Sequence, residues 1–161
     1  MAPMTGRANV PESLKTIIVC VDSYEDSFIE GAVFHGSFQG CREFANLMQL
    51  ILIVENILDE TGFPQAAAEK RRFRAACATN NETAGEPRTE SEFDGSEHGI
   101  EARKGRLATF MLKVMFRHSA SWQGSVAWTE GSREESFRSA LELFALMDSA
   151  LIHSVAENGA D

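Results

Sequence analysis

Residues 109–128 read TFMLKVMFRHSASWQGSVAW, and this stretch decides the fold because an earlier part of the chain repeats its pattern. A shift of 93 residues lays residues 16–59 over residues 109–152 without a gap. The matched pairs are Val21 with Val114, Gly31 with Gly124, Val33 with Val126, Phe44 with Phe137, Leu50 with Leu143 and Leu58 with Leu151. Because these matches fall at the apolar and glycine positions that a fold needs, the sequence predicts a duplicated module.

Each copy is predicted to begin with strands. In the second copy, apolar and mixed positions alternate with the two-residue period of a strand that has one buried face. The predicted inward residues are Phe110, Leu112, Val114 and Phe116, and the predicted outward residues are Met111, Lys113, Met115 and Arg117. A second strand is predicted over residues 122–128 and a short third one over residues 134–137. Gly31 and Gly124, at equivalent strand positions, are predicted to mark a bulge or bend.

Each copy is predicted to end with an amphipathic helix. Asn46 with Gln49, and Ser139 with Glu142, have the spacing of a capping box, so a helix is expected to begin after each cap. Gly62 is expected to end the first helix. That helix is apolar on more than one face, which leaves two alternatives: a central position in the fold, or a homodimer interface. The residues responsible are Leu50, Leu52, Ile53 and Ile57.

The resulting prediction is an α+β protein with two strand–strand–(strand)–helix modules, related by a pseudo-twofold axis. The modules, residues 14–64 and 106–155, share an antiparallel sheet with the helices on one face, and form one compact domain. Residues 65–105 are polar, rich in turn-forming residues and predicted to be a mostly disordered linker. Residues 1–13 are predicted to be a disordered N-terminus and residues 156–161 a disordered tail.

The composition limits where the protein is expected to act. A chain of 161 residues with 43% hydrophobic residues can bury a substantial core. The strongly apolar run at residues 47–58 is too short to span a bilayer, and no targeting segment is recognised, so a cytoplasmic location is expected. The three cysteines, Cys20, Cys41 and Cys77, are odd in number and have no metal-type spacing, which favours reduced thiols.

Negative charge is concentrated in the first copy. The formal net charge is −9 for the chain, −6 for residues 14–62 and 0 for residues 106–155. An acidic surface repels nucleic acid phosphates and attracts basic protein surfaces. The candidate partner-binding residues are Asp22, Glu25, Asp26 and Glu30. The alternative is that the charge serves only solubility.

Two groups of residues indicate nucleic acid binding instead. The outward face of the second copy carries Lys113, Arg117 and Gln123, with Trp122 on the neighbouring strand, and such a face can receive a single nucleic acid strand. The second group is the basic cluster Lys70, Arg71 and Arg72 before the linker. The alternatives are a sheet face that packs on the other copy, and a solvated helix end.

Glu55 and Asp148 lie at equivalent positions within the apolar helix faces, where a carboxylate needs a partner. One alternative is an acid/base pair or a cation site. The other is structural: each carboxylate caps a backbone amide or pairs with Arg117 or Lys15. The structural alternative is favoured. The four histidines are scattered, and the sequence has neither a phosphate-binding glycine loop nor a nucleophile elbow. We therefore expect no enzymatic activity, no cofactor and no metal.

Three segments of the second copy resemble those of a known protein family. Residues 120–128, ASWQGSVAW, with residues 137–143, FRSALEL, and residues 147–151, MDSAL, resemble a family of short uncharacterised proteins from anaerobic Gram-positive bacteria, for which no activity is known. The topology also resembles the Whirly and positive-cofactor-four type of single-strand DNA binders, which implies nucleic acid binding. The first copy lacks the basic strand faces of those proteins.

Two functions follow as expectations. The leading one is a non-enzymatic acidic module that binds a basic surface of a nucleic-acid-handling protein, as anti-CRISPR inhibitors and other DNA mimics do. The second is a single-strand nucleic acid binding protein that uses the sheet face of the second module.

Overall fold

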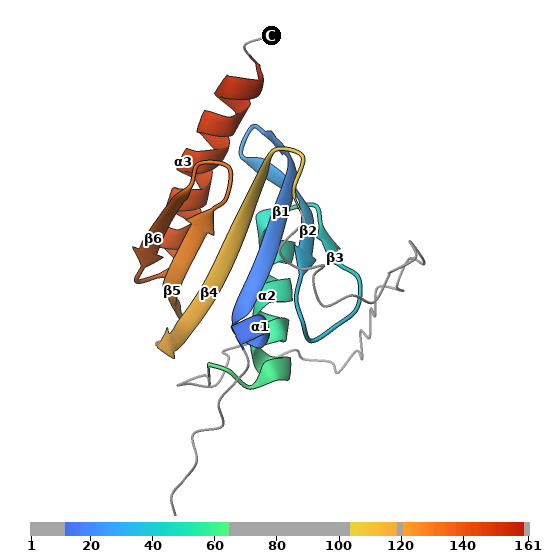
Figure 1. Cartoon of the computed structure of the whole chain (residues 1–161), viewed down its shortest axis with the longest axis vertical. Coiled ribbons are helices and arrows are strands. Elements are labelled where there is room, and N and C mark those ends of the chain that lie inside the picture. Colours follow the sequence, from blue (N-terminus) through green and yellow to red (C-terminus); the bar gives the residue numbers. More distant parts are fainter. Residues whose placement is uncertain (1–11, 65–103, 119–120, 160–161) are drawn as a thin grey trace, which may run out of the picture.

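A computed structural model of the chain shows a single sheet with its two long helices on the same face (Figure 1). The structure describes residues 12–64, 104–118 and 121–159. The elements are, in chain order, α1 (Glu12–Lys15), β1 (Thr16–Glu25), β2 (Phe28–Phe34), β3 (Arg42–Phe44), α2 (Leu47–Thr61), β4 (Ala108–His118), β5 (Ser121–Trp128), β6 (Arg133–Phe137) and α3 (Ala140–Asn158). The predicted α+β class, with an antiparallel sheet, is confirmed.

The six strands are arranged in the order β3-β2-β1-β4-β5-β6, and every neighbouring pair is antiparallel. The two halves of the chain therefore meet between β1 and β4 at the centre of the sheet. Thr16 pairs with Lys113, and Cys20 pairs with Thr109, so the register has the symmetry of a twofold axis between these strands. The halves share element order and register, whereas descent from one duplicated module stays a prediction.

The core lies between the sheet and the two helices. Alternate residues of the central strands, among them Val19, Phe110 and Leu112, are buried against this side. α2 packs on β2 and β3, and α3 packs on β4, β5 and β6. Each helix thus covers the strands of its own half, as the apolar spacing of its sequence requires.

Both predicted capping boxes are present. The amide of Gln49 donates to Asn46 Oδ1 at 2.9 Å, and the side chain of Gln49 accepts from the amide of Ala45 at 2.7 Å. The amide of Glu142 donates to Ser139 Oγ at 3.1 Å in the same way. α2 ends at Gly62, whose φ of 64° is the left-handed conformation that glycine adopts readily.

The two sheet irregularities lie opposite the glycines, and not on them. The register shifts between Val21 and Ser23 in β1, which faces Gly31, and between Val114 and Phe116 in β4, which faces Gly124. A Cβ atom at either glycine would overlap a carbonyl oxygen of the bulged strand. The bulge therefore belongs to the partner strand, and the glycine makes room for it.

The bulge in β4 reverses the predicted orientation of the residues after it. Phe116 was expected to face the core, but its side chain is 64% exposed. Arg117 was expected to face outward, but it is 8% exposed and points to the helix side. The prediction for these two residues is wrong because one extra residue in the strand changes the alternation of its side chains.

Several predicted boundaries differ from the described elements or lie outside them. α3 continues to Asn158 and so includes residues that were assigned to a disordered tail. Residues 12 and 13, predicted to belong to a disordered N-terminus, are part of α1. The predicted disorder of residues 1–11 and 65–103 lies outside the described residues, as does the basic cluster Lys70, Arg71 and Arg72.

Candidate protein-binding surface

The hairpin of β1 and β2 brings the acidic candidate residues to one end of the sheet (Figure 1). Its two-residue turn consists of Asp26 and Ser27, whose φ values of 48° and 67° are those of the turn type that matches strand twist. Glu25 pairs with Phe28 across the turn. Since the turn is this short, the register of the residues beside it is fixed.

The pairing gives the hairpin two chemically distinct faces. Tyr24 pairs with the buried Ile29 on the helix side. Side chains alternate along a strand, so Glu25, Phe28 and Glu30 project from the opposite face. Phe28 is 68% exposed, and Glu25, Asp26 and Glu30 are exposed around it. We call Asp22, Glu25, Asp26, Phe28 and Glu30 the acidic hairpin surface.

Asp22 has a structural contact that the other acids of this surface lack in the described residues. Its Oδ1 accepts a hydrogen bond from the amide of Arg106 at 3.0 Å, and the amide of Leu107 donates to Val21 O at 2.9 Å. Asp22 therefore joins the start of the second half to the bulge in β1. Its carboxylate is exposed but partly engaged.

The second half has no corresponding charges at the equivalent positions. Met115, Gln123 and Ser136 stand where the first half has Asp22, Glu30 and Glu43. Glu43 of β3 is exposed and pairs with Ala32, on the same face as Glu30. This extends the acidic region across a third strand, and sequence reasoning did not select it.

Phe28 was also missed as a site residue. The signal was present in the sequence, because a two-residue turn at Asp26 and Ser27 pairs Phe28 with the outward residue Glu25.

The described residues predicted to bind nucleic acid lie on opposite faces of the sheet. Arg117 and Trp122 face the helices and are buried. Lys113 and Gln123 lie on the other face of the sheet and are partly buried. The predicted group does not form one surface.

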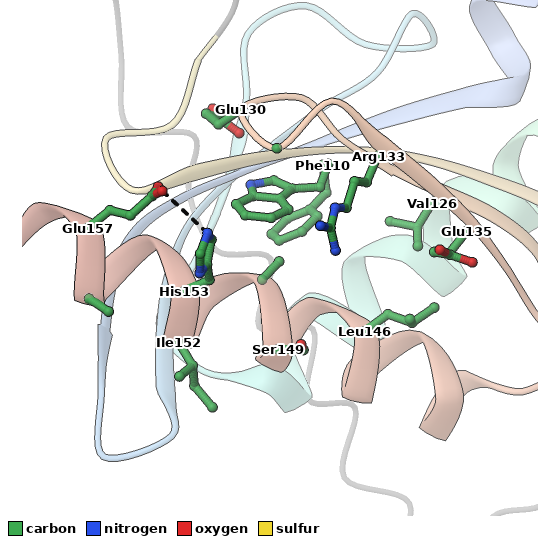
Figure 2. Close-up of a pocket in the computed structure, with 14 residues that line it drawn as sticks. Phe110, Val126, Glu130, Arg133, Glu135, Leu146, Ser149, Ile152, His153 and Glu157 are labelled. Atoms are coloured by element: carbon green, nitrogen blue, oxygen red, sulfur yellow. Dashed lines mark ion pairs between the residues drawn. The ribbon is translucent and has the colours of Figure 1, made fainter.

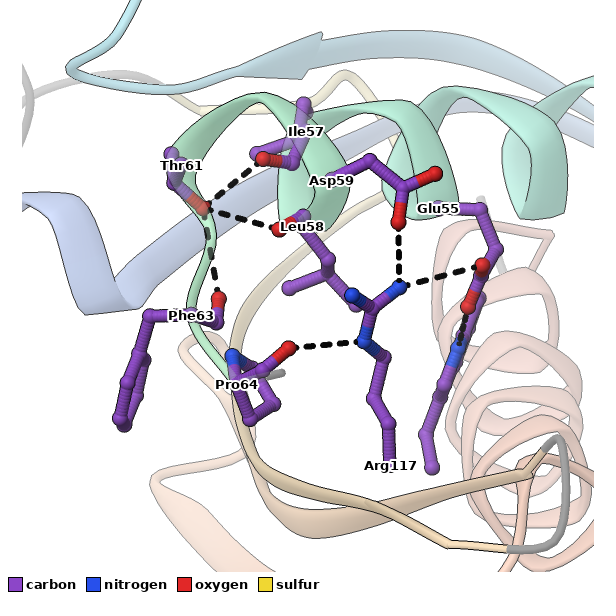
Figure 3. Close-up of polar contacts among 9 residues, drawn as sticks. Glu55, Ile57, Leu58, Asp59, Thr61, Phe63, Pro64 and Arg117 are labelled. Carbon is purple, nitrogen blue, oxygen red and sulfur yellow. Dashed lines mark hydrogen bonds and ion pairs between the residues drawn. The ribbon is translucent and has the colours of Figure 1, made fainter. Parts of the chain in front are cut away.

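Arg117 is held inside the protein by three acceptors of the first half (Figure 3). Its Nε donates to Pro64 O at 2.9 Å, and its Nη1 lies 2.8 Å from Asp59 Oδ1 and 3.3 Å from Glu55 Oε2. The Nε1–H of Trp122 donates to the other oxygen of Glu55. A guanidinium enclosed by two carboxylates is not available to a phosphate.

Glu55 and Asp148 each bind a side chain of the opposite half. Glu55 accepts from Arg117 and Trp122, while Asp148 accepts from the hydroxyl of Tyr24. The hydrogen bond to Asp148, together with burial, raises the pKa of Tyr24. Both carboxylates thus make structural contacts, as the structural alternative predicted, and Arg117 is one of the two predicted side-chain partners.

Two features are absent from the described ranges, residues 12–64, 104–118 and 121–159. No group of three or more His, Cys, Asp or Glu side chains there is arranged to hold a metal ion. None of the helices in these ranges has the length and apolar character needed to cross a membrane.

Comparison with protein family models, curated proteins and solved structures found no match to the chain. The family resemblance of residues 120–151 therefore stays a prediction. A function can therefore be proposed only from the chemistry of the protein's surface.

Proposed function

We propose that this chain is a non-enzymatic protein-binding module, and that its acidic hairpin surface engages a basic surface of another protein. The observation that carries the proposal is the exposed ring of Phe28 between Glu25 and Glu30 on one face of the hairpin. Aromatic side chains are enriched among the residues that carry most of the binding energy at protein interfaces. A guanidinium or ammonium group of a partner can pack on the ring and pair with the carboxylates.

We further propose that the partner is a nucleic-acid-handling protein, which the acidic surface inhibits or regulates as a DNA mimic of the anti-CRISPR type does. Proteins that hold nucleic acid carry clustered lysines and arginines. An exposed row of carboxylates supplies the opposite charge and competes for the same site. The exposed Glu43 beside Glu30 supports this, since it lengthens the row.

The test is affinity capture from a lysate of the source organism, after nuclease treatment, with mass spectrometry as the readout. The bait is compared with a Glu25→Gln/Glu30→Gln variant and with a Glu134→Gln/Glu157→Gln control, which changes the net charge equally at exposed positions of the second half. We expect one nuclease-resistant partner that the hairpin variant loses and the control retains. Equal recovery by both variants, or recovery that nuclease abolishes, contradicts the proposal.

Single-strand nucleic acid binding is the second candidate, and Phe116 supports it. Phe116 of β4 is the register partner of Gln123 in β5, and its side chain is exposed on the face that also carries Lys113. An exposed aromatic ring can stack on a base. Phe116 would replace the buried Trp122 as the aromatic residue of the predicted group. This candidate requires binding to a single-stranded oligonucleotide that weakens steeply with salt and is lost in Phe116→Ser.

A further inference from the structure

A cavity of about 710 Å³ lies in the second half, between α3 and the strands β4, β5 and β6 (Figure 2). Its apolar wall consists of Phe110, Val126, Trp128, Leu146, Ala150 and Ile152. Charged and polar groups, among them Arg133, Glu135 and His153, form its rim. This volume lies within the range of small-molecule sites in proteins.

The equivalent place in the first half is filled by side chains. His35, at the position of Trp128, is buried, and the ring of Phe38 lies beside it with the two ring centroids 6.2 Å apart. The guanidinium of Arg42 lies 4.4 Å above the centre of the Phe38 ring. Arg42 also reaches across to Glu60 of α2 at 3.2 Å, which closes the site. The fold thus accommodates an aromatic ring at this place.

Three differences keep the second site open. Gly131 stands against the ring of Trp128, so closely that a Cβ atom there would overlap it, and the turn has no counterpart of Phe38. Glu135 and His153 replace the pair Arg42 and Glu60 at the equivalent positions of strand and helix. In the part of the chain that the structure describes, His153 pairs with Glu157 of its own helix at 3.3 Å, and not with Glu135.

The wall of the cavity also contains an unsatisfied donor. Among the described residues, the Nε1–H of Trp128 is buried without a hydrogen-bond acceptor. Burying a donor in this way lowers stability, so its presence needs an explanation. Trp128 is held by packing, with its ring edge-on to His153 at a centroid distance of 5.7 Å. A large ring kept at the wall of an open cavity is a platform for another ring.

The rim determines the charge that a ligand would carry. The lining includes three carboxylates, Glu130, Glu135 and Glu157, and one guanidinium, Arg133, so it carries more negative than positive formal charge. Glu130 is already engaged, since its Oε2 accepts from the amide of Thr109 at 2.8 Å, and Glu157 is paired with His153. Glu135, exposed on β6, is the carboxylate best placed to meet a cation at the mouth.

We propose that this cavity binds a small arylalkylamine, with the aromatic ring against Trp128 and the ammonium group at Glu135. The ligand ring lies beside Trp128, as the Phe38 ring lies beside His35 in the first half. The ammonium group pairs with the exposed Glu135 carboxylate at the mouth of the cavity through a charge-assisted hydrogen bond. This site is separate from the acidic hairpin surface and does not depend on the function proposed for it.

The test follows the indole Nε1–H resonance of Trp128 in the full chain by NMR, assigned with Trp128→Phe. Three probes of similar shape are titrated: phenethylamine, 2-phenylethanol and phenylacetate. We expect phenethylamine to shift the resonance and to bind at least about tenfold more tightly than phenylacetate, with 2-phenylethanol between them.

Glu135→Gln and Glu134→Gln form a matched pair of variants, because these neighbours in β6 project to opposite faces of the sheet. We expect Glu135→Gln to weaken phenethylamine binding severalfold and to leave 2-phenylethanol unchanged, whereas Glu134→Gln changes neither. The proposal is overturned if no probe shifts the resonance, if phenylacetate binds most tightly, or if the two variants behave alike.

Discussion

Arg117 Nη1 lies 3.3 Å from Glu55 Oε2, which ties the strand β4 of one half to the helix α2 of the other. Tyr24 occupies the position equivalent to Arg117, and its hydroxyl donates to Asp148, the residue equivalent to Glu55. Both donors follow a strand bulge. The two halves are therefore joined twice, by reciprocal contacts of different chemistry.

The Arg117 contact predicts a large stability effect. Its side chain is 6% exposed, and Arg117→Ala removes the guanidinium that pairs with Glu55 and Asp59. We expect the free energy of unfolding to fall by roughly 2–4 kcal/mol, somewhat less than for a fully buried pair because both carboxylates are partly exposed. Urea unfolding measures it. Arg42→Ala, which removes the more exposed pair with Glu60, serves as the control and should cost less than about 1 kcal/mol.

The bulges predict that two glycines cannot be replaced. Gly31→Ala and Gly124→Ala each place a Cβ atom on a backbone carbonyl of the neighbouring strand. We expect each to lower the free energy of unfolding by about 1–3 kcal/mol, because backbone must move to relieve the overlap. Gly159→Ala, at the end of α3 and at negative φ, should change it by less than about 0.5 kcal/mol. Equal effects at all three positions would show that the bulges are placed wrongly.

His35 predicts a dependence of stability on pH. Its Nε2–H donates to Leu14 O and its Nδ1 accepts from the amide of Ser37, so the neutral ring is required. Burial, with repulsion from Arg42 as a smaller cause, lowers the pKa of His35 below its usual 6.5. At pH values between the lowered pKa of His35 in the folded chain and the usual 6.5 in the unfolded chain, the unfolded chain binds more protons than the folded one. The His35 contribution is therefore complete above pH 6.5 and is lost as the pH falls toward the folded-state pKa.

The corresponding measurement compares wild type and His35→Gln by urea unfolding at several values between pH 8 and pH 5. The variant lacks this titration, so the difference between the two proteins should shrink as the pH decreases. A constant difference would mean that His35 titrates alike in both states.

The homodimer through α2 also stays a prediction. Leu50 and Ile57 are buried, but Met48 and Leu52 are exposed on the outer side of the helix, with Leu52 at 55%. If this stripe forms an interface, sedimentation equilibrium should give a dimer for wild type and a monomer for Leu52→Lys. A monomeric wild type at micromolar concentration would exclude the interface.

Much of the fold could be predicted because its signals are local. The alternation in residues 110–114, the capping boxes at Asn46 and Ser139, and the stop at Gly62 depend on neighbours in sequence, and each was found where predicted. The bulge could not be placed, because Met115 and Phe116 are both apolar and either could face the core. The extra residue of the bulge places Arg117 on the helix side, away from Lys113 and Gln123.

The cavity could not be predicted from the sequence, for a different reason. It exists because Gly131 replaces bulk near Trp128 and because Glu135 and His153 do not repeat the pairing of Arg42 and Glu60. Those relationships join residues of a turn, a strand and a helix. Only a comparison of the two halves in space reveals them.

Amide hydrogen exchange of the chain with its captured partner tests directly whether the acidic hairpin surface is the interface. We predict protection concentrated in residues 22–30, and its disappearance in Phe28→Ser, which should leave stability nearly unchanged because the ring is exposed. Protection confined to residues 111–125 on β4 and β5, with residues 22–30 unaffected, would contradict the claim.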